Sequence, residues 1–176
     1  MIARPLAPRT ESALRSAPLS IPHGLTLHGP LPAGYRRFTH SVALSRRGLE
    51  GAAAELFSWR VYQRAGLGVH TSDEVACLGT VVQLRLGFGV AAIRMPCRVT
   101  EVIDDPDRRG FTYATLPGHP EAGMERFLLE RIHDGTLHFS VTAVSAPASL
   151  PARLAPPLAR AVQDAFTRRY LRGLEP

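Results

Sequence analysis

Apolar and polar residues alternate along much of the chain, as they do in strands that bury one face. The first such segment covers residues 35–44, where Phe38 and Val42 fall on the same side. Further alternating segments lie at 80–89, 95–105, 110–116, 125–132 and 136–145. An Asp-Pro-Asp turn at 105–107 and a His-Asp-Gly turn at 133–135 predict two β-hairpins among them. The pattern therefore predicts an antiparallel sheet built from consecutive strands.

Two segments have the apolar spacing of amphipathic helices. One follows Ser45, a candidate N-cap, and runs through an alanine-rich stretch that contains Trp59 and ends at Gly66. The other begins near Pro157 and continues towards the C-terminus. Strands followed by a long C-terminal helix favour an α+β fold, in which a curved antiparallel sheet grips that helix.

The core expected from these faces is made of large apolar residues from both kinds of element. Its predicted members are Phe38, Val42, Leu56, Val82, Leu84, Val99, Phe111, Phe127, Leu129, Phe139, Val141, Leu158, Val162 and Phe166. Residues 1–32 contain six prolines, which predicts an extended N-terminal arm. A short helix is expected near Thr10, which could act as its N-cap. Residues 33–176 are expected to form a single domain.

Composition excludes some classes of protein. The chain has 176 residues, of which 45% are hydrophobic and 20% are charged, as is usual for a globular protein. No apolar run approaches the about 18 residues of a membrane-spanning helix, and the N-terminus lacks the apolar segment of a signal peptide. We therefore expect no transmembrane segment and a cytoplasmic location.

The formal net charge is +6, which raises the question of nucleic-acid binding. The chain contains no lysine, and its arginines occur as scattered pairs such as Arg36-Arg37 and Arg168-Arg169. No basic stripe is interleaved with aromatic residues. Nucleic acid is therefore not the expected partner, although arginine-rich faces leave an interaction module open as an alternative.

Several motifs resemble a known family. "SWRVYQRAGLGV" (58–69), "MPCRV" (95–99), "ATLPGHPEAGMERF" (114–127) and "TAVSAPASL" (142–150) occur in the order and spacing of the uncharacterised domain-of-unknown-function family nineteen-ninety of bacteria and plants. The resemblance covers about residues 30–174. The order of elements is similar to the helix-grip topology of the START and Bet-v-1-like (SRPBCC) superfamily. The family brings no established enzyme activity.

The chain departs from the family pattern at two positions of the central motif. Ala114 stands where the resemblance implies glycine, and Met124 stands where it implies the first of two paired glutamates. His119 and Glu125 match the family pattern. A mechanism that requires both paired glutamates is therefore not expected here.

The central motif also carries the candidate chemistry. His119 lies in a Gly- and Pro-rich turn, and Glu121 and Glu125 follow closely. A histidine beside a carboxylate can act as an acid–base pair or bind a metal, but the same residues can equally form a structural turn with an ion pair. Because Glu125 precedes Phe127 by two residues, both are expected on one strand face, with Glu125 at the rim of a cavity and held by an arginine.

Other candidate ligand contacts are Arg98, Trp59 and Tyr113. Arg98 is otherwise expected to face solvent, unless it pairs with Glu101 or Glu125, and Trp59 is otherwise expected in the core. Cys77 and Cys97 fit no metal-binding spacing and are expected to be buried free thiols. We expect neither a metal nor a cofactor.

The leading functional hypothesis is a binding protein that holds a small hydrophobic or amphipathic ligand between the sheet and the C-terminal helix. One alternative is a small-molecule enzyme that uses His119 and Glu125 as an acid/base pair. The other alternative is a protein or nucleic-acid interaction module that uses the arginine-rich faces.

Overall fold

The computed structural model describes residues 3–87, 89–150, 154 and 156–175. Within them the chain forms an eight-stranded sheet of order β1-β3-β4-β5-β6-β7-β8-β2, in which all neighbouring strands are antiparallel except the parallel pair β1 and β3. The elements are β1 (Arg4–Pro5), α1 (Pro8–Ser16), β2 (Arg36–Ala43), α2 (Leu49–Phe57), α3 (Arg60–Arg64), β3 (Gly68–Thr71), β4 (Val81–Leu86), the 3-10 helix η1 (Gly89–Ala91), β5 (Ile93–Asp104), β6 (Arg108–Thr115), β7 (Glu121–Arg131), β8 (Leu137–Pro147) and α5 (Pro156–Arg172). This is the predicted α+β architecture.

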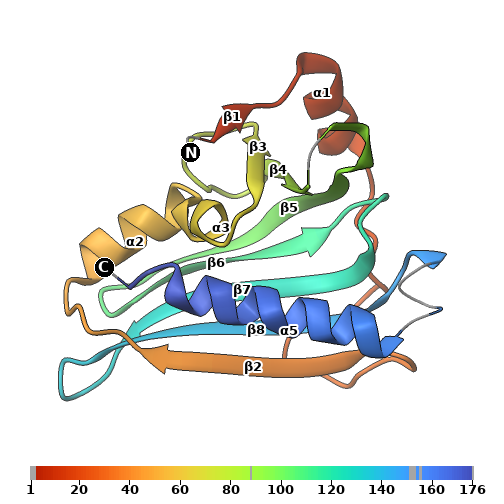
Figure 1. Ribbon diagram of the computed structural model, residues 1–176. Coiled ribbons are helices and arrows are strands. Elements are labelled where there is room, and N and C mark those ends of the chain that lie inside the picture. Colours follow the sequence, from red (N-terminus) through yellow and green to blue (C-terminus); the bar gives the residue numbers. More distant parts are fainter. Residues whose placement is uncertain (1–2, 88, 151–153, 155, 176) are drawn as a thin grey trace.

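Helices α2, α3 and α5 cover one face of the sheet (Figure 1). Helix α5 crosses β8 and β2, and its C-terminal half contacts α3. Helices α2 and α3 cover the other end of the same face, where α2 packs on β6 and β7. The two predicted hairpins, β5–β6 and β7–β8, are both present.

The core lies between this face and the helices. Phe111, Phe127 and Phe139 come from three neighbouring strands and stack in a row, with ring centroids 5.7 Å and 6.3 Å apart. All three rings are fully buried, since residues that alternate along each strand point to the same side. Nine predicted core residues are buried: Leu56, Val82, Leu84, Val99, Phe111, Phe127, Leu129, Phe139 and Val141.

The remaining predictions for the core differ in outcome. Phe38, Val42 and Phe166 are only partly buried, because β2 is an edge strand and Phe166 borders a cavity. The prediction for Val162 is wrong, since it is 43% exposed. The side chain of Leu158 lies outside the described residues.

The single helix predicted up to Gly66 is in fact two helices. Trp59 adopts a left-handed backbone conformation, with φ of 65°, and this ends α2 before α3 begins. The turn directs the indole into the core, where Nε1 donates to the carbonyl of Asp73 at 3.2 Å. Gly48, and not Ser45, is the N-cap of α2, and the Ser45 hydroxyl instead bonds Glu175 at 2.6 Å.

The N-terminal arm runs over the opposite, outer face of the sheet. Its α1 agrees with the predicted short helix, except that Ala7 is the N-cap in place of Thr10. Leu6 packs with Val81 and Leu116, while further along the arm Leu25 and Leu27 pack with Val144. Strand β1 pairs only at the edge of the sheet, as the proline content of the arm requires.

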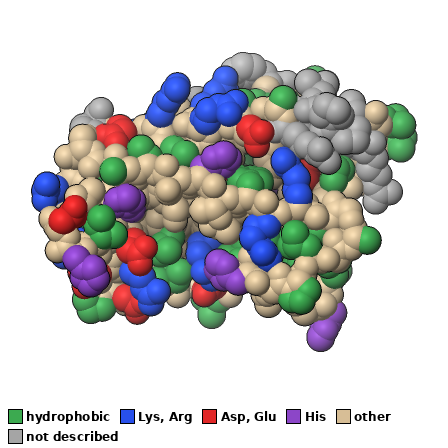
Figure 2. All heavy atoms as spheres, turned by 90° about the horizontal axis from the view of Figure 1, so that it is seen from below, with side chains coloured by type: hydrophobic (Ala, Val, Ile, Leu, Met, Phe, Trp, Pro, Cys, Tyr) green, Lys and Arg blue, Asp and Glu red, His purple; other side chains and the backbone are tan. Residues whose placement is uncertain are grey.

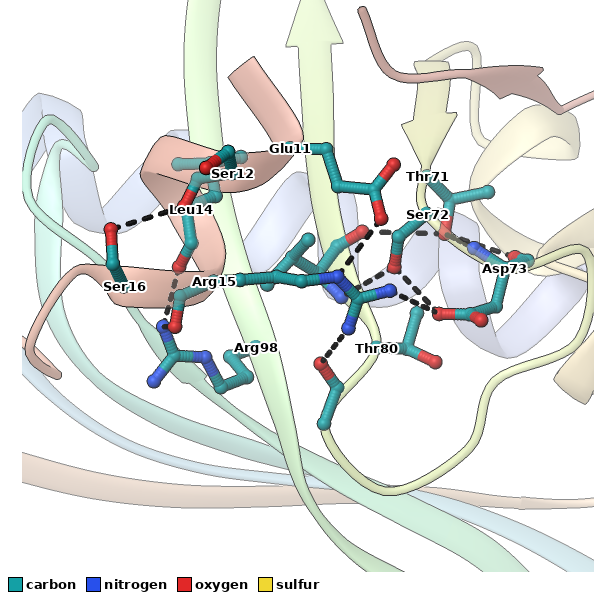
Figure 3. A network of polar contacts seen from close by, with 12 residues as sticks. Glu11, Ser12, Leu14, Arg15, Ser16, Thr71, Ser72, Asp73, Thr80 and Arg98 are labelled. Carbon is teal, nitrogen blue, oxygen red and sulfur yellow. Dashed lines mark hydrogen bonds and ion pairs between the residues drawn. The ribbon is translucent and has the colours of Figure 1, made fainter. Parts of the chain in front are cut away.

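Arg98 binds the C-terminal end of α1 (Figure 3). Its guanidinium donates to the carbonyls of Leu14, Arg15 and Ala17, the last two at 2.7 Å and 2.8 Å. The prediction that Arg98 faces solvent is therefore wrong. A cation that satisfies the last carbonyls of a helix also complements its dipole.

No helix in the described part of the chain is both long and apolar enough to cross a membrane. Figure 2 shows one face of the molecule, on which basic, acidic, histidine and apolar side chains are interspersed. Several arginines are ion-paired, such as Arg126 with Glu101 at 2.7 Å. The basic charge is therefore partly neutralised where it occurs.

Candidate functional site

A cavity of about 330 Å³ lies between the sheet and α5, where β6 ends and β7 begins. Most of its wall is apolar, because the inward-facing residues of β4, β5 and β8 and one side of α5 are apolar at this point. These residues include Leu84, Leu86, Ile93, Met95, Ala143, Val162 and Phe166. Helices α2 and α3 cover the other end of the sheet and leave this end to α5 alone (Figure 1).

The turn between β6 and β7 places His119 in the cavity wall. Gly118 has φ of +94°, which only glycine adopts readily, and the His119 amide bonds back to the carbonyl of Leu116 at 3.1 Å. Nδ1 of His119 lies 3.0 Å from the amide nitrogen and 2.9 Å from the carbonyl oxygen of Glu121. Burial lowers the pKa of His119 to about 4, so the ring is neutral at physiological pH.

Glu125 borders the same cavity, directly opposite Tyr113 in the β6–β7 register. The Tyr113 hydroxyl donates a hydrogen bond to Oε2 of Glu125. Burial raises the pKa of Glu125 to about 7, and the bond from Tyr113 opposes that rise. Glu125 does share its strand face with Phe127, as predicted, but the predicted arginine partner is wrong: among the described residues no ion pair includes Glu125.

Three tyrosines surround this carboxyl group. Tyr113 and Tyr170 line the cavity, and Tyr62 lies behind them, with its ring centroid 6.4 Å from that of Tyr113 and 5.3 Å from that of Tyr170. Burial, followed by the negative charge of Glu125, raises the pKa of all three hydroxyls. Within the described residues the buried Tyr62 hydroxyl has no hydrogen bond of good geometry, although the Tyr113 hydroxyl is near enough to affect its pKa.

A second polar group of residues lies at the start of β7. Glu121 also lines the cavity; burial raises its pKa, while the Ser145 hydroxyl and the positive charge of Arg36 act against the rise. The amide of Gln163 on α5 donates to the Ser145 hydroxyl at 3.2 Å and accepts a hydrogen bond from Arg36. Strand β7 thus brings two carboxylates to one cavity, one beside Tyr113 and the other beside Ser145 and Arg36.

The structure separates two of the predicted site residues from the rest. Trp59 is fully buried in the core and Arg98 binds α1, and neither lines the cavity. Cys97 is buried as predicted, but the prediction for Cys77 is wrong, because that thiol is exposed in the loop before β4. No group of three or more His, Cys, Asp or Glu side chains that could hold a metal occurs in the described ranges.

Tyr170 and Ser145 border the cavity but were not predicted from the sequence. Tyr170 lies four residues after Phe166, so it extends the apolar stripe of α5, and Ser145 follows Ala143 by two residues on the inward face of β8. Both spacings were available in the sequence. The pairing of Gln163 with Ser145 depends on how α5 crosses the sheet, which no local pattern specifies.

Of the two departures from the family pattern, Met124 borders the cavity and Ala114 does not. Ala114 and Met124 are register partners on β6 and β7. The Met124 side chain packs with the outer-face cluster of Leu25, Leu27 and Val144. A glutamate at position 124 would therefore share that outer face, while Glu125 points to the inner one.

The fold is that of the helix-grip, Bet-v-1-like proteins. A hypothetical protein of Helicobacter pylori superposes with a TM-score of 0.57 at 12% identity, covering 80% of this chain and 84% of its own. Major latex-like protein 151 of Panax ginseng superposes with a TM-score of 0.53 at 15% identity, covering 81% and 99%. At such identities the likeness establishes the fold alone.

The sequence then gives the family. The model of the family described as "Domain of unknown function (DUF1990)" matches residues 21–173, so the chain belongs to this family. The UPF0548 protein of Deinococcus radiodurans is 35% identical over an alignment 190 positions long, which covers 98% of this chain and 96% of that protein. The predicted family and fold are both confirmed.

Proposed function

We propose that this protein binds a small hydrophobic or amphipathic ligand in the cavity between the sheet and α5. The observation that carries the proposal is a cavity of about 330 Å³ with a largely apolar wall, into which a few polar groups converge. That volume is near the lower end of the roughly 300–1,000 Å³ usual for ligand sites. The ligand is correspondingly small.

The polar groups are suited to orient such a ligand. His119, Glu121, Glu125 and Tyr113 all border the cavity, each held by a neighbour in the protein. Apolar contact with Met95, Ala143 and Phe166 would supply affinity, and the polar groups would select orientation. We do not include Trp59 and Arg98 among the proposed contacts.

The test measures binding of a neutral fluorescent reporter, N-phenyl-1-naphthylamine, whose emission rises in an apolar site. We expect saturable binding at one site, and native mass spectrometry of freshly purified protein should show a retained small molecule. Ala143→Phe fills the cavity and should abolish reporter binding, because Ala143 is buried in its wall. The matched variant Ala161→Phe, at an exposed position of α5, should bind as the original protein does.

Failure of the reporter to bind, or equal binding by folded Ala143→Phe, would refute the proposal. Circular dichroism and a cooperative thermal transition would establish that each variant is folded. A retained mass that survives Ala143→Phe would place the ligand elsewhere.

An enzymatic role is the second candidate, and the pKa of Glu125 favours it. A buried carboxyl group with a pKa of about 7 beside a tyrosine hydroxyl is suited to proton transfer near neutral pH. His119 and Glu125 bond to different groups, so the acid/base role falls to Glu125 alone. Any turnover found by metabolite screening should disappear in Glu125→Gln, and turnover that survives it would exclude this role.

A further inference from the structure

We infer that the ligand is a cation: a small amphipathic amine or quaternary ammonium compound whose charged group lies against Glu125 and the tyrosine rings around it. The inference rests on the proposed function, because it takes the cavity to be the binding site. It adds the chemical class of the ligand.

Glu125 has no cationic partner among the residues that the structure describes. Its side chain borders the cavity, and in the described part of the chain its one hydrogen bond comes from Tyr113. A buried carboxylate is costly unless it is paired with a positive charge. The acid lies in an apolar cavity, and no arginine of the described residues forms an ion pair with it. A cationic ligand would complete the pair.

An aromatic surface lies beside the carboxyl group. Tyr113, Tyr170 and Phe166 border the cavity together with Glu125. Their centroid distances place them in one continuous cluster, since Tyr170 lies 6.2 Å from Phe166 and 5.3 Å from Tyr62, which lies 6.4 Å from Tyr113. The faces of such rings attract ammonium groups, and quaternary ammonium ligands are commonly held in this way. The carboxylate and the rings therefore favour the same charge.

The described wall of the cavity offers no positive charge to an anion. No arginine is among the described residues that border the cavity, and the low pKa of His119 leaves its ring neutral. Arg36 lies beyond the wall and is engaged with Gln163. An anionic ligand would meet Glu125 with like charge. A neutral ligand that accepts a hydrogen bond would need Glu125 protonated. Its affinity would therefore rise at low pH, whereas the affinity of a cation would rise at high pH.

The experiment compares three eight-carbon probes that differ in charge: octylamine, 1-octanol and octanoate. The affinity of each probe is measured from its displacement of N-phenyl-1-naphthylamine at pH 8 and at pH 5.5. At pH 8 Glu125 is mostly ionised, and we expect octylamine to bind at least about tenfold more tightly than 1-octanol, with octanoate weakest. At pH 5.5 Glu125 is protonated, and the advantage of the amine over the alcohol should shrink towards one.

Two variants tie this preference to the residue. Glu125→Gln keeps the shape of the side chain but removes its charge, so the amine should lose its advantage at pH 8 while reporter binding remains. Glu130→Gln removes a charge from an exposed position of the same strand and should keep the advantage. Should Glu125→Gln fail to fold, Tyr113→Phe gives a second measurement, because loss of its hydrogen bond should move the onset of amine preference to higher pH.

The outcomes separate the two proposals. If the reporter binds but 1-octanol or octanoate binds as tightly as octylamine at pH 8, the cation inference is wrong and the cavity remains a ligand site. An amine advantage that persists in Glu125→Gln also overturns it. If the reporter does not bind, the proposed function itself fails and the inference fails with it.

Discussion

Tyr113 and Glu125 face each other on neighbouring strands, and the tyrosine hydroxyl donates a hydrogen bond to the carboxylate inside the cavity. The pairing follows from the register of β6 and β7, in which both residues point inward. Burial favours the neutral acid, whereas the hydrogen bond favours the carboxylate. The pKa of about 7 is the balance of these two effects.

Replacing Tyr113 with phenylalanine should therefore raise the pKa of Glu125 further above its usual value. The ring keeps its packing, and only the donor to the carboxylate is lost. The carboxyl carbon of Glu125, followed by NMR through a pH titration, measures the shift directly. Tyr35→Phe, on the outer face, is the matched control and should leave the Glu125 pKa unchanged. A Glu125 pKa that falls in Tyr113→Phe would show that the hydroxyl does not stabilise the charged form.

Glu125 should also make the folded state less stable as pH rises. Its folded pKa of about 7 exceeds the ordinary value of 4.5, so the folded protein holds the proton more tightly than the unfolded chain. Below pH 4.5 both states are protonated, and the stabilising effect is present in full. As pH rises to 7 and above, about 3 kcal/mol of that effect is lost. The free energies of unfolding in urea of the original protein and of Glu125→Gln should diverge by this amount as pH rises. Parallel plots of the two free energies against pH would contradict the burial of the charge.

His119 should act in the opposite direction. Its folded pKa of about 4 lies below the ordinary value of 6.5, so the unfolded chain binds the proton more readily. The stabilising effect is present above pH 6.5 and is lost as pH falls towards 4, by about 3 kcal/mol. Because Glu125 stabilises the fold over much of the same range, the comparison is relative: as pH falls from 6.5 to 4, the original protein should lose this amount relative to His119→Gln, whereas the control His133→Gln, at an exposed position, should follow the original protein. An unchanged acid profile in His119→Gln would mean that the ring is solvated when folded.

The strands could be read from the sequence because each buries one face and so alternates with a period of two. The short β3 was missed, since its four residues give no more than two periods. The break at Trp59 was missed for a different reason: the helical pattern continues through it, and the left-handed turn is stabilised by core packing and by the bond to Asp73. Tertiary contacts decide such positions.

The candidate site was predicted in part. The turn that holds His119 and the shared face of Glu125 and Phe127 both follow from local rules, and His119 and Glu125 do border the cavity. The supposed arginine partner of Glu125 failed because it was inferred from the cost of a buried charge alone. That cost is met here by a raised pKa and by Tyr113, a choice that depends on strand register.

Phe139 tests the assignment of the inner face of β8. It is fully buried at the end of the row of three phenylalanines, so Phe139→Ala should lower the free energy of unfolding by about 3–5 kcal/mol. Phe38→Ala, on the edge strand and only partly buried, should cost clearly less. Denaturant titration of both variants gives the comparison. A loss under about 1 kcal/mol for Phe139→Ala would place the ring outside the core.

Removal of the arm, residues 1–28, should leave a cooperatively folding domain of lower thermal stability. The outer face that the arm covers is polar at Thr39, Thr112 and Arg126, so water can replace the arm over much of it. The cost comes from exposing Val81, Leu116 and Val144, which lose Leu6, Leu25 and Leu27 as neighbours. Arg98 loses the carbonyls at the end of α1 but gains solvation, at little cost. No described residue of the arm borders the inner cavity, so the shortened protein should still bind N-phenyl-1-naphthylamine. Calorimetry measures the thermal transition of the shortened protein, and reporter titration measures its binding. Loss of the cooperative transition would show that the arm is part of the core.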